Sequence, residues 1–265
     1  VGGTSGLIYG YVNDGFYKVE DFEYFDSKSR TWKLKEGVVD SSPLSDTPRP
    51  GNAKFKKLTP VDPNSSNPYQ LTEADRTVIG NTTPKFSGGF GLNATYKGFD
   101  LSMFFNFMYD FDVFNANKVM LTTWADNHEN NFGMEVASDK RWRNFDDMGN
   151  EIRYSPELLA EFNKNATMWN PTSIGKPISM SYAVEDGSFL RLNSATLGYT
   201  LPQEWTKKAG LNKVRFYVAG SNLFTITGYS GYDPEVDIAT GLTPNIDNNR
   251  YPRSRTYTFG AQLTF

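Results

Sequence analysis

The chain has 265 residues, a length that fits one large β domain or two small domains. Aromatic residues make up 15% of it, with 20 Phe and 15 Tyr, while charged residues make up only 22%, and this composition favours a β-rich fold. A formal charge of −3 provides no basic surface for nucleic acid, and the lack of cysteine excludes disulfides and thiolate chemistry.

Alternation of apolar and polar residues predicts six strands, because successive side chains of a strand point to opposite faces. The first, over residues 7–12, is the weakest, since two apolar residues interrupt its alternation. Residues 86–96 and 101–109 come next, and we expect them to form a hairpin in which Gly98 permits the reversal.

Three further strands follow the hairpin. Residues 190–201 alternate in two registers, and the offset between the registers predicts a bulge near Asn193. Residues 214–219 form the next expected strand. The clearest alternation is in residues 256–265, where the chain stops on an apolar position.

The connections between these strands are of two very different lengths. Residues 97–99 and 202–213 are short connections, whereas 15–85, 111–187 and 225–252 are long, polar and rich in Pro, Asn, Asp and Gly. Transmembrane β-barrels sort their connections in this way, with short periplasmic turns and long external loops. Strands of about ten residues also match the roughly 9 to 11 that a tilted barrel strand needs to cross hydrocarbon.

The sequence predicts no membrane-spanning helix, because no stretch reaches the roughly 18 apolar residues that such a helix needs. The chain also opens at Val1 without the charged and apolar regions of a signal peptide. An exported protein would need sequence before Val1, so we expect the chain to be a fragment.

The apolar faces of the expected hairpin and of the last strand carry no Asp, Glu, Lys or Arg. Lipid contact requires this, because a charge at the bilayer midplane costs roughly 2 to 4 kcal/mol. The core face of a soluble sandwich would be equally free of charge, so the unequal connections carry more weight. Four tyrosines near strand ends fit an interfacial aromatic girdle or ordinary strand positions: Tyr96, Tyr109, Tyr199 and Tyr257.

Several segments resemble characteristic stretches of the SusC/RagA-type TonB-dependent transporters, in the order expected for that family. The matching segments are 74–81 (ADRTVIGN) with 84–86 (PKF), 96–102 (YKGFDLS), 187–192 (GSFLRL) with 197–202 (LGYTLP), 221–229 (SNLFTITGY), 231–235 (GYDPE) and 251–255 (YPRSR). The resemblance covers most of residues 74–265 and leaves the middle of 111–187 and much of 17–70 unmatched.

The resemblance implies an all-β fold in which residues 1–265 are the C-terminal portion of one antiparallel transmembrane β-barrel domain. About six strands of a barrel of the 22-strand type would lie in this chain, with long extracellular loops. An open sheet in lipid leaves two edges of unpaired backbone groups, which are costly there. The rest of the wall, the plug domain, the TonB-contacting segment and the signal peptide are therefore expected outside this chain.

The family implies TonB-dependent import of oligosaccharides or oligopeptides across a Gram-negative outer membrane, without bond chemistry and without a cofactor. The chain is therefore not expected to be an enzyme. The implied partners are a SusD-like surface lipoprotein that closes as a lid, the TonB complex, outer-membrane lipid, and the remainder of the barrel and plug. No nucleic-acid partner is expected. Glycan and peptide importers share these motifs, so the sequence determines neither the substrate nor the oligomeric state.

Four aromatic residues of the 111–187 loop are candidates for contact with a sugar ring or a lid protein: Trp124, Trp142, Tyr154 and Trp169. The same residues could equally pack the loop against itself. The alternative to the barrel is a soluble or surface-attached β-sandwich that binds glycans through such aromatics. A barrel protein would stay with the membrane through carbonate washing, whereas a binding module would not.

Two further groups of residues follow from the barrel interpretation. Arg215 and Tyr217 lie on the polar face of their strand and would face the lumen, where Arg215 would lie near the plug or only solvate the wall. The last strand resembles the C-terminal signature that the outer-membrane assembly machinery recognises, carried by Tyr257, Phe259, Leu263 and Phe265.

The sequence predicts no catalytic site. His128 is the single histidine, and no second histidine or cysteine exists for a metal site or a nucleophile relay. Asp233, Glu235 and Asp237 alternate along the chain, but we expect them in an exposed loop, which cannot split their pKa values as acid–base catalysis requires.

No metal site is predicted either. Many members of the family carry an acidic loop just before the position of Asp75 and Arg76, of the kind that could coordinate a hard cation. Here the 51–70 segment offers only Asp62 and Asn64 as oxygen donors, fewer than the six or so that calcium needs. We therefore expect no calcium in this loop.

Overall fold

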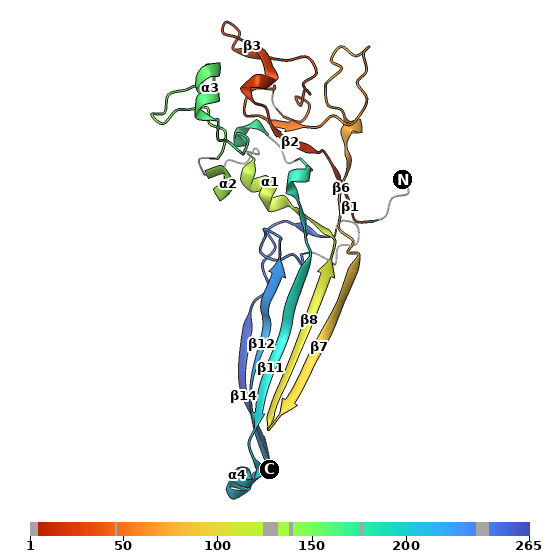
Figure 1. Cartoon of the computed structure of the whole chain (residues 1–265), viewed down its shortest axis with the longest axis vertical. Coiled ribbons are helices and arrows are strands. Elements are labelled where there is room, and N and C mark those ends of the chain that lie inside the picture. The colour runs from red at the N-terminus through yellow and green to blue at the C-terminus, as the bar shows by residue number, and fades with distance from the viewer. Residues whose placement is uncertain (1–4, 46, 124–131, 138–139, 175–177, 237–243) are drawn as a thin grey trace. The chain divides into compact units, whose positions relative to one another are not determined.

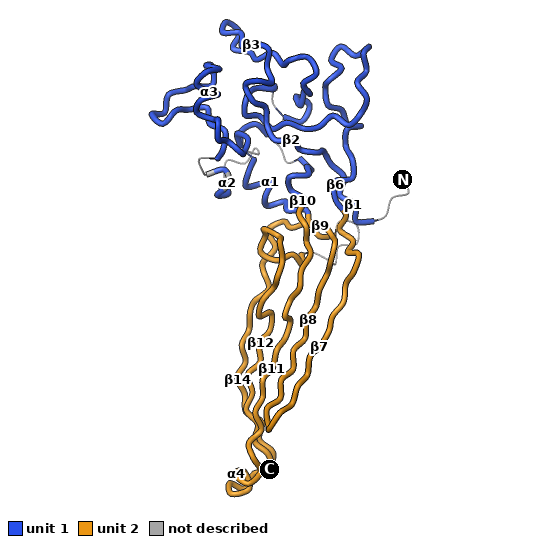
Figure 2. The backbone as a smooth tube through the Cα atoms, viewed as in Figure 1, with its two compact units in different colours: residues 1–80, 114–184 blue, residues 81–113, 185–265 orange. Residues whose placement is uncertain are grey.

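A computed structural model describes residues 5–45, 47–123, 132–137, 140–174, 178–236 and 244–265. The chain divides into two compact units, which are described separately. Unit 1 combines residues 1–80 with 114–184, and unit 2 combines 81–113 with 185–265 (Figure 2). Each unit is therefore built from segments that are far apart in the sequence.

Unit 2 is built on an antiparallel sheet of five long strands (Figure 1). These strands correspond to five of the six that the alternation predicts. One of them, β12, is longer than expected because the alternation resumes beyond Asn222 and continues to Thr227. In spatial order the strands are β14 (Thr256–Thr264), β12 (Lys213–Thr227), β11 (Phe189–Thr200), β8 (Phe99–Tyr109) and β7 (Phe86–Tyr96).

The sixth candidate, over residues 7–12, does not join this sheet. It forms only the short strand β1 (Leu7–Gly10), which pairs with β6 (Thr77–Asn81). The expectation of about six strands is therefore corrected to five in this sheet. The interrupted alternation of residues 7–12 is the physical reason, because the segment has no continuous apolar face to add.

The expected bulge near Asn193 is confirmed. The pairing of β11 with both of its neighbours shifts register between Leu192 and Ser194. The shift brings Leu192 and Ala195 to the same face of the sheet, although three positions separate them in the sequence. Apolar residues on both sides of the bulge therefore lie on one face of the sheet.

Both short connections lie at one end of the sheet. Lys97 and Gly98 have positive φ angles of 46° and 86°, as in the two-residue turns that close right-twisted hairpins. The other connection holds the helix α4 (Gln203–Thr206) and the 3-10 turn η5 (Lys207–Ala209), which ends at a left-handed Gly210. The long connections leave from the opposite end of the strands.

A further small sheet, most of whose residues belong to unit 2, consists of β10 (Val184–Asp186), β9 (Asp112–Asn115) and β13 (Ile246–Asp247). The phenol of Tyr229 donates a hydrogen bond to Asp247 at 2.7 Å. A cluster of buried residues lies beside it: Phe111, Val113, Phe189, Tyr229 and Val236.

Unit 1 contains the first two long segments, which carry secondary structure of their own. Strand β2 (Asn13–Phe16) pairs with β5 (Ala53–Phe55), and β3 (Phe22–Asp26) pairs with β4 (Thr31–Leu34). Among the described residues, no helix is long and apolar enough to cross a membrane. The helices and 3-10 turns are α1 (Ala116–Thr122), α2 (Met134–Ala137), α3 (Pro156–Phe162), η1 (Val19–Asp21), η2 (Glu73–Asp75), η3 (Pro171–Ser173) and η4 (Ser181–Ala183).

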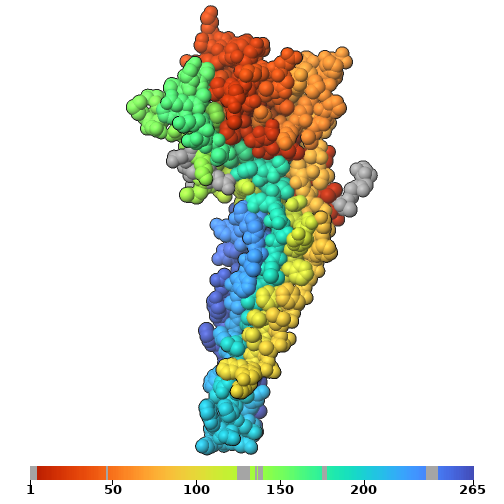
Figure 3. Space-filling view, in the orientation of Figure 1, coloured from red at the N-terminus to blue at the C-terminus, as the bar shows by residue number. Residues whose placement is uncertain are grey.

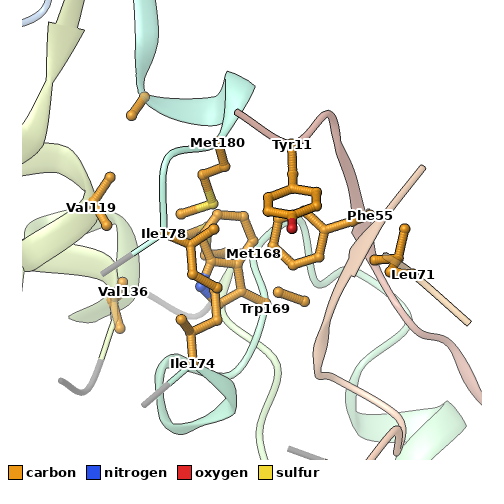
Figure 4. Packing of buried hydrophobic residues seen from close by; sticks show 12 residues of the cluster. Tyr11, Phe55, Leu71, Val119, Val136, Met168, Trp169, Ile174, Ile178 and Met180 are labelled. Carbon is orange, nitrogen blue, oxygen red and sulfur yellow. The ribbon is translucent and has the colours of Figure 1, made fainter. Parts of the chain in front are cut away.

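The core of unit 1 joins its two segments. Tyr11 and Phe55 come from the first segment, and Trp169 and Met180 come from the second (Figure 4). The backbone N–H of Tyr11 donates to the carbonyl of Ser179 at 2.9 Å, so hydrogen bonds as well as apolar contacts link the segments. These long polar segments therefore do not behave as separate loops.

Gly51 is a position where unit 1 requires glycine. Its φ is +87°, and a Cβ atom there would lie 2.1 Å from Cδ1 of the buried Trp142. The carbonyl of Gly51 also accepts a hydrogen bond from the N–H of Asn170 at 2.8 Å, so the backbone cannot withdraw without loss.

Gly51→Ala should therefore destabilise unit 1 more than Gly37→Ala does. Gly37 has nearly the same φ, +86°, but no atom lies within 4 Å of its added Cβ, so it is a control for backbone strain alone. We expect the extra cost to be about 1–3 kcal/mol, the usual cost of overpacking a core. Thermal unfolding and limited proteolysis would measure it, and equal losses for the two variants would contradict the packing argument.

Candidate membrane interface and polar face

The register of the five strands gathers most of their apolar residues on one side of the sheet, which we call the apolar face. Phe104, Met108 and Phe189 lie on the other side. It comprises the even-numbered residues of β7 and β12, the odd-numbered residues of β8 and β14, and residues 190, 192, 195, 197 and 199 of β11. Phe90 pairs with Phe105, with ring centroids 4.9 Å apart, and Val218 pairs with Phe259. No Asp, Glu, Lys or Arg occupies any of these positions.

The apolar face is exposed in the chain itself. Leu92 is 51% exposed and Phe259 is 79% exposed. The side chains of β7 and β8, coloured yellow, form part of the visible surface (Figure 3). A contiguous exposed apolar surface marks a site of contact with protein or membrane, because water solvates it poorly. Most side chains of this face are exposed or half-buried, although Leu192 and Val214 are buried.

The four tyrosines expected near strand ends lie on the apolar face. Tyr96 and Tyr199 are at the end with the short connections, and Tyr109 is at the opposite end of β8. Tyr257 pairs with Gly220, near the beginning of β14. Their role as an interfacial girdle stays a prediction.

The opposite side, which we call the polar face, carries Arg215 and Tyr217. The Nε of Arg215 donates to Oδ1 of Asp100 at 2.9 Å, and a second guanidinium nitrogen donates to Oδ2, so the pair is bidentate. Gly198 lies between them, and a Cβ there would be 2.3 Å from the guanidinium. The glycine therefore permits a charged pair to cross three strands.

Tyr217 continues this arrangement along the polar face. The Cζ of Arg215 lies 5.2 Å from the centroid of the Tyr217 ring, as in a cation–π contact. The ring in turn covers Gly260 of β14, where a Cβ would be 2.4 Å from its Cζ. Both residues lie on the face that the alternation assigns to them. Whether that face lines a lumen stays a prediction.

A buried ion network brings together three of the segments that resemble the family. Arg191, 2% exposed, donates through a guanidinium nitrogen to Asp233, and its Nη1 lies 3.4 Å from Oε2 of Glu235. Arg253 lies on the other side of Glu235, with 2.8 Å between Nη2 and Oε1. The network therefore ties β11 to the two parts of the connection between β12 and β14.

The expectation that Asp233 and Glu235 lie in an exposed loop is wrong. Their side chains are each 11% exposed, because the buried guanidinium of Arg191 neutralises them and draws them against the sheet. Asp237 lies outside the described residues. Arginines within GSFLRL and YPRSR, on either side of the acidic GYDPE, were the signal in the sequence that could have indicated the network.

The three loop aromatics that the structure describes, Trp142, Tyr154 and Trp169, are not brought together. Trp142 and Trp169 are buried in two different hydrophobic clusters, and Nε1 of Trp169 donates to the carbonyl of Thr122 at 3.1 Å. Tyr154 is half-buried, with Arg30 4.8 Å from its ring centroid. Trp124 and His128 lie outside the described residues. The structure gives the two buried tryptophans a packing role, and contact with a substrate or a lid stays a prediction.

The terminal strand presents the residues of the expected assembly signature on the apolar face. Phe259 pairs with Val218 and Leu263 pairs with Val214, both across the β12–β14 ladder. Phe265 follows the strand and is exposed. Recognition of these residues by an assembly machinery stays a prediction.

Asp75 organises the segment where a cation site was considered. Its fully buried carboxylate accepts hydrogen bonds from the N–H groups of Leu58, Thr59 and Thr72 at 2.7–2.9 Å. Nζ of Lys57 lies 3.4 Å away. Burial by itself raises the pKa of Asp75, but these hydrogen bonds outweigh it and hold the pKa well below its usual value. Within the described ranges, no three carboxylate or imidazole groups are placed to share a metal ion.

Comparison with known proteins gives relatives of one kind, although no family model matches the chain. TonB-dependent receptor P3 of Formosa agariphila is 32% identical over 270 residues, which cover 100% of this chain and 22% of the receptor. TonB-dependent receptor SusC of Bacteroides thetaiotaomicron is 37% identical over 86 residues, 32% of this chain and 8% of SusC. The chain thus spans less than a quarter of these relatives.

Solved structures share its fold. A structure of the RagAB peptide transporter matches with a TM-score of 0.64 at 22% identity, over 99% of this chain and 23% of that chain. The RagAB peptide importer in an open-open state matches with a TM-score of 0.61 at 23% identity, over 97% of this chain and 22% of that chain.

The chain belongs to the TonB-dependent receptors of the SusC/RagA type, as its sequence motifs predict. Receptors of this family reside in the outer membrane and are transporters, so the expectation that the chain is not an enzyme is confirmed. Closure of a barrel, the total number of its strands and the assignment of residues 1–265 to one barrel domain stay predictions.

Leu92→Arg should block assembly of the receptor, whereas Asn93→Arg should be tolerated. The two residues are neighbours near the middle of β7 and point to opposite faces. An arginine at the bilayer midplane costs about 2–4 kcal/mol on the lipid side and little on a polar side. Heat-modifiable migration in gels and the yield in outer-membrane fractions would measure assembly. Similar yields for both variants would contradict lipid contact.

Asp75→Asn should loosen residues 57–75, while Asp62→Asn should not. Asp62 is exposed and accepts one hydrogen bond, from the N–H of Asn64, so it is a matched control. The amide at position 75 would leave a buried N–H and Lys57 without their carboxylate, at a cost of about 1–3 kcal/mol. Limited proteolysis of this segment would show faster cleavage, and equal cleavage of both variants would contradict the assignment.

The difference in stability between the Asp75→Asn variant and the parent protein should depend on pH in one direction. The pKa of Asp75 is lower in the folded protein than in the unfolded chain. The stabilisation that its carboxylate provides is therefore complete above the pKa of the unfolded chain, about 3.9. It should disappear only as the pH falls through the lower folded pKa. A difference that already vanished near neutral pH would show that the carboxylate charge is not responsible.

Proposed function

We propose that this chain forms part of the wall of a TonB-dependent importer that carries oligosaccharides or oligopeptides across a Gram-negative outer membrane. One observation carries the proposal: five antiparallel strands of nine to fifteen residues present a single exposed face without charge. Tilted strands of about 9–11 residues suffice to cross hydrocarbon. Acyl chains are therefore the partner that fits this face.

The two edges of the sheet support a larger barrel. β7 and β14 are the outermost strands, and among the described residues no strand pairs with their free edges. In hydrocarbon each unpaired backbone group would cost several kcal/mol, so both edges need neighbours from the rest of the receptor. We expect a closed barrel of about 22 strands, the size that holds a plug in its lumen.

The polar face would line the lumen of that barrel. Arg215 and Tyr217 lie close to the end with the short connections, which is the periplasmic end in this orientation. There they would face the plug. The opposite end would open to the environment, and the segments of unit 1 leave the strands at that end.

The partners follow from the same orientation. A SusD-like surface lipoprotein would bind over the external segments and close on substrate, and the TonB complex would act from the periplasm. The RagAB structures are those of a peptide importer, which makes an oligopeptide one of the two substrate classes for this chain. We propose no cofactor and no bond chemistry.

Epitope tags at two glycines test the orientation. Gly149 in unit 1 and Gly210 between β11 and β12 both have left-handed φ and open space around them, so each should accept an insertion equally well. On intact cells an antibody should label the tag after Gly149 and not the tag after Gly210. The second tag should become accessible when the outer membrane is permeabilised.

A surface-attached β-sandwich would give a different result. Both tags would then be labelled on intact cells, and carbonate washing would release the protein from membranes. Capture through the Gly149 tag also tests the lid, because a surface lipoprotein should co-purify with the receptor. A receptor that retains its substrate uptake but captures no lipoprotein would contradict the lid.

A further inference from the structure

A pocket of about 300 Å³ lies beside the ion network of unit 2. Its wall includes the three arginines Arg191, Arg253 and Arg255, and the polar residues Asn222, Thr225 and Tyr232. Ligand sites in proteins have volumes from about 300 Å³ upwards, so the pocket can hold one sugar or amino-acid residue.

The charges around the pocket do not cancel. Asp233 and Glu235 are engaged by Arg191 and Arg253, as described above. Arg255 has no ion pair with any of the described residues, and its side chain is exposed at the pocket. Three guanidinium groups thus face two carboxylates, which leaves one positive charge for a ligand.

The floor of the pocket also has an unsatisfied donor. Nε of Arg191 is buried and makes no hydrogen bond to the described part of the chain, although Arg191 is only 2% exposed. A buried donor without a partner costs free energy that an incoming acceptor recovers. Oε2 of Glu235 is also buried without a hydrogen bond, but Glu235 does not line the pocket, whereas Arg191 does. Both the excess charge and the Arg191 donor therefore favour an oxyanion.

The backbone that carries Arg253 and Arg255 is held in place before a ligand binds. Asn222 has a left-handed φ of 53°, and its side-chain amide donates to the carbonyl of Ser254 at 3.1 Å, which holds the segment of Arg253 and Arg255 against β12. The first pair of β14, Thr256 with Ser221, fixes the backbone directly after Arg255. A backbone that is already fixed loses little freedom on binding, which favours affinity.

We propose that this pocket is an anion-binding subsite that takes a carboxylate group of an acidic solute. The inference deepens the proposed function, on which it rests, by assigning an acidic group to the imported substrate. Arg255 would supply the charge, because guanidinium groups bind oxyanions through two parallel N–H donors. Tyr232, which is 84% exposed, would add a neutral donor at the rim.

The test uses the complete receptor, purified from outer membranes that have passed carbonate washing. Calorimetric titration would compare three probes: glucuronate, N-acetylglycine and neutral glucose. The first probe carries the carboxylate of an acidic sugar and the second that of a peptide C-terminus. At least one of the two anions should bind saturably and more tightly than glucose, and the tighter one identifies the source of the carboxylate.

Arg255→Gln should weaken binding of that anion about tenfold, the effect of losing one strong charge-assisted contact. Lys208→Gln removes the same charge from the exposed connection between β11 and β12 and should leave binding unchanged. Tyr232→Phe should weaken binding about threefold, as the loss of a neutral hydrogen bond does. All three positions are exposed, so folding should be preserved.

Two results would overturn the subsite: neither anion binds more tightly than glucose, or Lys208→Gln weakens binding as much as Arg255→Gln. Either result, obtained with a receptor that resists carbonate washing, leaves the importer proposal in place. Release of the receptor by carbonate would contradict the importer itself.

Discussion

Hydrocarbon accepts a strand only when its outward side chains are apolar and its backbone groups are paired, and the proposal for unit 2 depends on both conditions. The first condition is met within the chain, since no charged residue occurs on the apolar face of the five strands. The second is met only inside the sheet. Among the described residues β7 and β14 have no outer neighbour, and in the proposed barrel the rest of the wall would join at these two edges. The bulge at Asn193 helps to meet the first condition. It shifts the alternation of β11 by one residue, so that apolar residues before and after it lie on the same face.

The charged residues of the five strands lie on the other face, where a glycine leaves room for one of the ion pairs. Asp100 and Arg215 meet across Gly198, where any side chain would separate them. Arg191 is buried deeper, and such a charge is tolerated only when paired, because desolvation of a lone guanidinium is expensive. Asp233 and Glu235 supply the pairing and hold the connection between β12 and β14 against the strands. The pocket lined by Arg255 lies beside these ion pairs.

Much of unit 2 could be predicted from alternation alone. The positions of the strands, the bulge and the composition of both faces follow from a period of two, which is a local property of the sequence. The family followed from short motifs such as GYDPE and YPRSR. The partners of those motifs could not be predicted, because nothing local indicates that Asp233 meets Arg191, a residue 42 positions away.

The fold of unit 1 could not be predicted from alternation, because its core also depends on contacts between distant segments. Its segments are polar and rich in turn-forming residues, so their scattered apolar residues show no period. Trp142 and Trp169 look like exposed loop aromatics in the sequence and prove to be core residues. Only the meeting of two distant segments creates the core that buries them.

That composite core has a consequence for the order in which the chain folds. Tyr11 and Phe55 are synthesised early, but the residues that bury them follow the hairpin of β7 and β8. The contact between Tyr11 and Ser179 closes a loop of 168 residues, and loops of that length close slowly. Until residues 114–184 have emerged, these apolar side chains can pack only within their own segment, as the rings of Tyr11 and Phe55 do. The first segment should therefore complete its packing later than the hairpin of β7 and β8 does.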